Sequence, residues 1–105
     1  MSRYPALRPT LTVDQGKAVH CAEILKAVAH PLRLRIVAIL CQGPENVTGL
    51  AERLGESQAI VSQQLRILRM RGLVRAEREN GFAEYRLLET NLRELVGTME
   101  RCSVR

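Results

Sequence analysis

The chain has 105 residues, a formal net charge of +5, and two tyrosines, one phenylalanine and no tryptophan. This length suits a single domain with an aliphatic core, and the positive charge favours a polyanionic partner such as nucleic acid. No apolar run is long enough to cross a membrane or to form the centre of a signal peptide, so we expect a cytoplasmic protein with no membrane contact.

The first part of the chain predicts an arm followed by two helices. Residues 1–13 show no helical or strand periodicity and contain two prolines, which predicts a flexible N-terminal arm ahead of a domain at 14–105. Asp14 is a suitable N-cap for a first helix with apolar residues at helical spacing. The pair His30-Pro31 ends that helix and begins a second one, which stops before a Gly-Pro pair.

The middle and end of the chain predict a winged helix-turn-helix. A short helix at 47–55 and a longer one at 57–71 are separated by one tight turn, and two strands at 73–79 and 82–88 follow, joined by an Asn-Gly turn. A last helix begins near residue 90. The expected class is therefore mainly α with a small β-hairpin, in the order of four helices, two strands and one helix. Alternating spacings of three and four on the last helix predict a seam for another helix, formed by Leu92, Leu95, Met99 and Cys102.

The second helix of the helix-turn-helix has the side chains that read duplex DNA. The segment 57–76 contains four arginines and no acidic residue. Gln and Ser side chains match the edges of bases, and Arg pairs with guanine or phosphate. The wing adds an arginine and an Asn-Gly tip that suit the DNA backbone. The predicted DNA contacts are Ser57, Gln58, Ser62, Gln63, Arg66, Arg69, Arg78, Asn80 and Gly81.

Other classes of function are less well supported. The sequence lacks a Ser/His/acid set on a nucleophile turn and a phosphate-binding Gly loop, so we expect neither an enzyme nor a cofactor. Few aromatic residues argue against RNA binding by stacking. A plain polar surface helix remains an alternative, as does a winged domain that binds proteins and no DNA.

Three segments carry a resemblance to a known family. They are LKAVAHPLRLRIVAIL at 25–40, VTGLAERLGESQAIVSQQLRILRMRGLV at 47–74 and EYRL at 84–87. Together they resemble the ArsR/SmtB family of bacterial winged-helix repressors. The resemblance implies a homodimer built from the first and last helices and a repressor that binds a pseudo-palindromic operator. It also implies release of the operator when a metal ion or a reactive small molecule is sensed.

The cysteines are the candidate sensor. The chain resembles a branch of thiol regulators in which Cys41 and Cys102 would be oxidised by persulfide or peroxide to a disulfide or polysulfide bridge. That branch has its first cysteine about one turn earlier, where Ala38 stands. Alternatives are a Cys21–Cys102 pair, a soft metal or arsenite site of all three thiolates, and three inert packing residues.

A divalent-metal sensor is not expected. The family's Cys pair in the third helix is missing from 47–54, and the last helix contains no histidine. His30 is expected to cap a helix, and His20 and Cys21 are neighbours that point about 100° apart on a helix.

Overall fold

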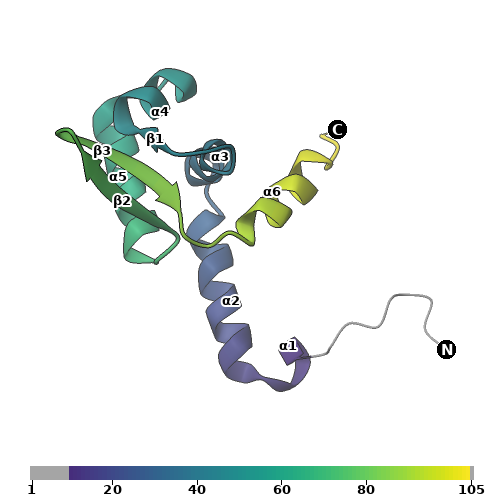
Figure 1. Ribbon diagram of the computed structural model, residues 1–105. Helices are drawn as coiled ribbons and strands as arrows, with labels where there is room; N and C mark the ends of the chain where they lie inside the picture. Colours follow the sequence, from purple (N-terminus) through teal and green to yellow (C-terminus); the bar gives the residue numbers. More distant parts are fainter. Residues whose placement is uncertain (1–9, 105) are drawn as a thin grey trace.

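Six helices and three short strands make up residues 10–104, the part of the chain that this computed structural model describes (Figure 1). They follow in the order α1 (Thr10–Val13), α2 (Gln15–Val28), α3 (Pro31–Leu40), β1 (Glu45–Asn46), α4 (Val47–Leu54), α5 (Gln58–Met70), β2 (Val74–Glu79), β3 (Phe82–Leu87) and α6 (Leu92–Glu100). Helices α4 and α5 form the helix-turn-helix, and β2 and β3 form the wing. The predicted fold class is confirmed.

Side-chain caps fix the starts of the helices where the sequence predicts them. Asp14 caps α2 and Ser57 caps α5, and each side chain accepts a hydrogen bond from the backbone N–H three residues later, that of Lys17 or Ile60. His30 caps α3, because its ring Nδ1 accepts the backbone N–H of Leu32 at 3.2 Å. Gly55 ends α4 in the left-handed conformation, at φ 67°. The boundaries between helices are thus determined by local sequence.

The wing is the predicted hairpin with one strand added. Strands β2 and β3 pair antiparallel with Val74 opposite Leu87. Asn80 and Gly81 have φ values of 53° and 83°, the pair of positive angles that a type I′ turn requires. Strand β1 pairs with the other edge of β3, so the sheet has the order β1-β3-β2. The prediction omitted β1 because two residues give no periodicity.

The N-terminal prediction needs correction. Of the expected flexible arm at 1–13, residues 1–9 lie outside the described residues. Thr10–Val13 form the helical turn α1, which contacts α2 through the Lys17 Nζ that donates to the Thr10 hydroxyl oxygen at 2.7 Å. Four residues are too few for a helical period to be recognised in the sequence.

The predicted seam of the last helix is divided between two surfaces. Helix α6 spans Leu92–Glu100, and Cys102 follows its end. Leu92 is buried in the core of its own chain, whereas Met99 and Cys102 are exposed. Only part of the seam is therefore available to another helix.

The core is aliphatic, and α5 lies at its centre, in contact with α2, α3, α4 and β2. No polar or charged side chain is buried among residues 10–104. The fully buried side chains are those of Ile36, Val37, Leu40, Leu50, Val61, Leu65, Leu68, Leu73 and Val74. Burial of one face of α5 leaves its opposite face outward.

The chain is extended for its length. Its radius of gyration is 15.9 Å, against about 13 Å for a compact globular chain of this size. In Figure 1, α2 projects below the winged core and α6 projects to its right. Val19 and Leu25 on α2 are 53% and 51% exposed. Within residues 10–104, no helix has the length and apolarity to cross a membrane.

Truncation of a core residue tests this packing. Leu65→Ala should lower the free energy of unfolding by about 2–5 kcal/mol, because Leu65 is fully buried and its removal leaves a cavity. Urea denaturation at a fixed protomer concentration measures the change. The control is Met70→Ala on the same helix, since Met70 is 79% exposed. Equal losses from both variants would contradict the observed burial of α5.

Candidate nucleic-acid interface

One face of α5 is exposed along its length and is polar at its centre. Helical residues are spaced by 100°, so the buried Val61 and Leu65 lie opposite Gln63 and Arg66. Ser62 flanks these two side chains and is exposed with them. The arrangement offers amide, hydroxyl and guanidinium groups together, which are the groups that bond to base edges and phosphates.

The turn before α5 sets the angle at which this face is presented. Gly55 has a left-handed backbone, and the Glu56 N–H donates to the Ala51 carbonyl at 3.0 Å. Ala51 is buried and small, which lets α4 and α5 approach closely. Ser57 then caps α5 and leaves the positive end of the helix dipole near the exposed polar face.

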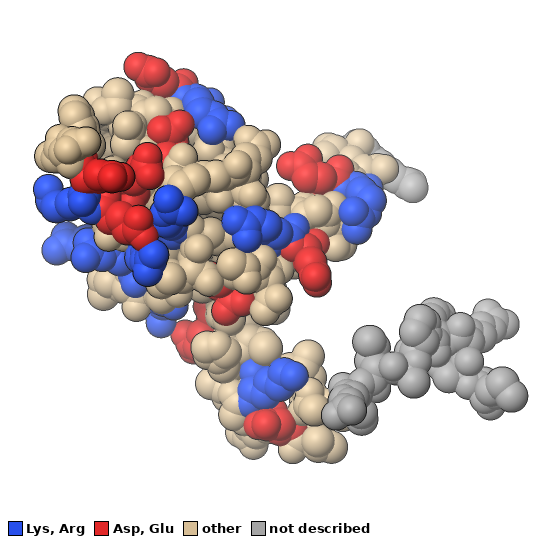
Figure 2. All heavy atoms as spheres, viewed as in Figure 1, with Lys and Arg blue, Asp and Glu red and all other residues tan. Residues whose placement is uncertain are grey.

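Ion pairs separate the arginines of this region into two groups. Arg71 pairs with Glu23 of α2 at 3.1 Å, and Glu77 pairs with Arg75 and with Arg86. Positive and negative side chains accordingly intermingle at the left of Figure 2, where the wing lies. Within the described part of the chain, the exposed Arg66, Arg69 and Arg78 form no ion pair. These are the three arginines that the sequence assigned to DNA, and their charge is unneutralised by any acidic partner.

The wing tip is exposed, with mixed charge. Arg78, Asn80 and Gly81 are all on the surface, as their predicted role requires. Phe82 follows the turn and is 70% exposed, and Glu79 is exposed beside it. An acidic side chain next to the tip limits the attraction of this strand pair for phosphate, so α5 is the stronger part of the interface.

The sequence prediction missed Ala59. This residue is exposed between Gln58 and the Ser62–Gln63 pair on the outward face of α5. A methyl group there suits contact with the methyl group of thymine. A helical projection of the sequence would have placed Ala59 on this face.

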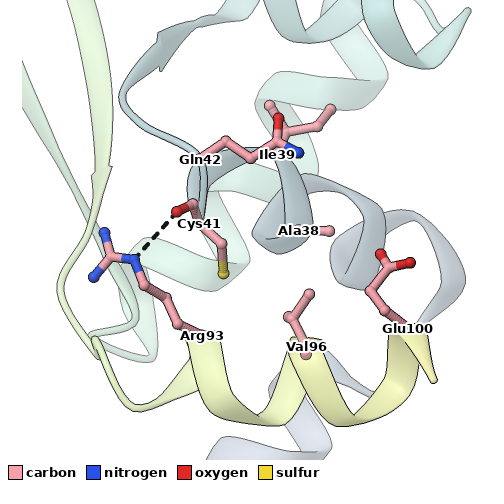
Figure 3. Close-up of a pocket in the computed structure, with 8 residues that line it drawn as sticks. Ala38, Ile39, Cys41, Gln42, Arg93, Val96 and Glu100 are labelled. Atoms are coloured by element: carbon pink, nitrogen blue, oxygen red, sulfur yellow. Dashed lines mark hydrogen bonds between the residues drawn. The ribbon is translucent and has the colours of Figure 1, made fainter.

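Cys41 is the C-cap residue of α3 and faces α6 (Figure 3). The Arg93 Nε donates to the Cys41 carbonyl oxygen at 3.1 Å, and the sulfur points toward α6 between Arg93 and Val96. An open cavity of about 500 Å³ lies between the two helices. Burial raises the pKa of the Cys41 thiol, and the Arg93 guanidinium offsets part of that rise by favouring the thiolate.

Cys102 does not share this cavity. Its exposed thiol donates to the Thr98 carbonyl oxygen at 3.8 Å, and it is not among the residues that line the space beside Cys41. All three cysteines are free. Ala38, where the resemblance places the partner cysteine, faces Glu100 near the end of α6. A disulfide requires α-carbons within about 7 Å. The two thiols have different surroundings in this structure, since Cys41 lines the cavity between α3 and α6 and Cys102 is exposed.

Cys21 lies in a third environment. It lines an apolar cavity of about 450 Å³ between α2 and α6, with Ile24, Leu92 and Leu95. Among residues 10–104, no three His, Cys, Asp or Glu side chains come together in a way that could hold a metal ion. The three-thiolate site considered above is therefore not assembled within the described part of one chain.

Comparisons with known proteins identify the chain's relatives. Residues 30–76 match the family described as "Bacterial regulatory protein, arsR family". The transcriptional regulator NmtR of Mycobacterium tuberculosis is 42% identical over 89 residues, which cover 85% of this chain and 74% of NmtR. The relatives found are regulators, so the expectation that the chain is not an enzyme is confirmed.

Solved structures agree with the sequence comparisons. The transcriptional repressor BigR from Xylella fastidiosa has a TM-score of 0.77 and 34% identity, over 86% of this chain and 94% of BigR. The homodimeric winged helix-turn-helix domain Mb0332 from Mycobacterium bovis, a possible ArsR-family regulator, has a TM-score of 0.71 and 27% identity, over 95% of this chain and 87% of that domain. With its fold, its helix-turn-helix and these relatives, this chain belongs to the ArsR family of bacterial transcriptional regulators.

Proposed function

We propose that this protein is a homodimeric repressor that places α5 of each protomer in the major groove of an operator. The observation that carries the proposal is the exposed face of α5, where Gln63 and Arg66 lie opposite a fully buried apolar face. The proposed base contacts are Ser57, Gln58, Ser62, Gln63 and Arg66, and the proposed backbone contacts are Arg69, Arg78, Asn80 and Gly81. Residues 14–105 would form the binding and dimerisation unit, which acts in the cytoplasm, where bacterial DNA lies.

The proposed dimer surface consists of the exposed sides of α2 and α6. Val19 and Leu25 on α2 and Met99 on α6 are each more than two-fifths exposed. Apolar side chains also line the cavity between these two helices. Each Å² of apolar surface that is buried contributes about 25 cal/mol of stabilisation, which favours binding of a second copy at this surface. The structural neighbour Mb0332 is homodimeric, which supports a dimer for this chain as well.

Twofold symmetry then determines the operator. Two α5 helices related by a dyad read two half-sites in opposite directions, so the operator is pseudo-palindromic. Half-site centres are expected about one helical turn apart, roughly 34 Å.

The proposal includes a thiol response at Cys41 and Cys102. Peroxide would accept two electrons and two protons from the two thiols, giving a disulfide and two water molecules. With two small-molecule persulfides as the oxidant, the two cysteines would form a trisulfide bridge, and the other products would be two thiols and one molecule of hydrogen sulfide. Cys41 lies between α3 and α6, and Cys102 lies beyond the end of α6. Bridging them therefore requires the last turn of α6 to move, and α6 belongs to the proposed dimer surface. Such a movement would change the distance between the two α5 helices and release the operator.

Gln63→Ala tests base recognition. The variant should bind the operator about 1–3 kcal/mol more weakly and discriminate less between bases at one position of each half-site, because it loses an amide that can bond to adenine. Gel-shift titration against the operator and single-base variants measures both effects. Gln42→Ala, on the exposed turn after α3 and outside both proposed surfaces, is the matched control. Unchanged affinity and base preference in Gln63→Ala would contradict the proposed docking.

Arg69→Gln tests backbone contact. The variant should weaken binding to all duplexes alike and reduce the slope of log affinity against log salt by about 1.8, because the dimer loses one phosphate contact in each half-site. Arg101→Gln removes the same charge from beyond the end of α6, far along the chain from the helix-turn-helix, and should leave the slope unchanged. If the two variants have the same slope, Arg69 does not contact phosphate.

Single cysteine variants test the thiol response. Treatment with polysulfide or peroxide should add a Cys41–Cys102 bridge to the parent, detected by mass spectrometry, and weaken operator binding. Cys41→Ser and Cys102→Ser should each lose the bridge and keep operator affinity after treatment. Cys21→Ser is the matched control and should respond as the parent does. A parental response in all three variants would refute the dithiol mechanism.

A further inference from the structure

Arg33 links three helices through one side chain. Its Nε donates to the Ala27 carbonyl oxygen at 2.6 Å, near the end of α2. A terminal nitrogen of the same guanidinium donates to the Gln64 side-chain oxygen at 3.0 Å, in the middle of α5. Arg33 itself belongs to the first turn of α3, and both Arg33 and Gln64 are half-buried.

Each bond satisfies a group that the fold leaves without a partner of its own. The carbonyl of Ala27 lies in the last turn of α2, where helical carbonyls have no N–H four residues ahead. Gln64 is about 100° around α5 from Gln63, on the flank between the buried and the exposed faces. The planar guanidinium donates in two fixed directions, so it can hold both acceptors at once, and a lysine ammonium does not reproduce this fork.

A second contact joins the same pair of helices. Arg71, at the end of α5, pairs with Glu23 of α2 at 3.1 Å. This pair is exposed and contributes little to stability alone. It nevertheless connects α2 to α5 at a second point, seven residues beyond Gln64 along the helix. Two separated connections restrict rotation of α5 relative to α2, whereas one would act as a pivot.

We propose that Arg33 is a positioning residue that fixes the orientation of α5 relative to the dimer helix α2, and so sets the half-site spacing that the repressor accepts. The inference rests on the proposed function, because α2 is part of the proposed dimer surface and α5 of the proposed DNA interface. Arg33 acts on DNA through Gln64 and α5. This role predicts that a variant without the two guanidinium hydrogen bonds discriminates less between operators with different half-site spacings.

The experiment uses the full chain and a duplex that the parent protein selects from a random-sequence pool. Arg33→Lys keeps the charge and removes the fork, and Gln64→Met removes the acceptor without a change of charge. Affinity is measured for the selected duplex and for one with an extra base pair between the half-sites. Arg33→Lys should bind the selected duplex about tenfold more weakly. The ratio of its affinities for the selected and the longer duplex should fall by about the same factor. Arg35→Lys makes the same substitution at an exposed position two residues farther along α3. It should change neither the affinity nor the spacing preference.

A double-mutant cycle separates positioning from direct contact. If Arg33 acts through Gln64, the double variant loses no more affinity than Arg33→Lys alone. Additive losses would overturn the inference, because Gln64 would then contact DNA on its own. Unchanged spacing preference in a folded Arg33→Lys dimer, checked by circular dichroism and sedimentation, would also overturn it. Should Arg33→Lys not fold, unchanged preference in Gln64→Met decides against it. A parent that selects no sequence overturns the proposed function itself, and this role with it.

Discussion

The burial of one face of α5 is the constraint on which the rest of the molecule depends. Val61, Leu65 and Leu68 are fully buried among aliphatic side chains from the surrounding helices and the sheet, so α5 cannot rotate without opening the core. The polar side chains on its other face are therefore presented in one orientation. Arg66 and Arg69 lie on that exposed surface without acidic partners among the described residues, whereas Arg71 is neutralised by Glu23. The packing that stabilises the domain also defines the surface that we propose contacts DNA.

The core leaves apolar sides of α2 and α6 exposed. The chain is too small and too extended to bury both α2 and α6, which project from the winged core (Figure 1). Apolar side chains of both helices remain at the surface. A symmetric partner is the simplest cover for such a surface, since each copy offers the same helices. In the proposed dimer, which forms through α2 and α6, the distance between the two α5 helices depends on how firmly α2 and α5 are held together. The bonds of Arg33 to Ala27 and Gln64 lie at that joint.

The three cysteines occupy three different environments, and this limits what thiol chemistry can do. Cys41 is half-buried beside Arg93 (Figure 3). Cys21 lies in the apolar space between α2 and α6, and Cys102 is exposed beyond the end of α6. No two of them line the same cavity. We propose that a bond between Cys41 and Cys102 within one chain is accompanied by a change in α6. That change would connect chemistry at sulfur to the shape of the dimer.

The sequence alone determined the boundaries of α2 to α5, the hairpin and the fold class, because caps such as Ser57 and turns such as Asn80-Gly81 act over a few residues. It also identified the exposed residues of α5, because helical spacing separates apolar from polar positions. Only the tertiary structure decided which arginines are paired and that β1 joins the sheet. It alone decided that the seam on α6 is divided, and that Arg33 reaches α5. These features depend on residues that are far apart in sequence, and no local pattern encodes the distance between them.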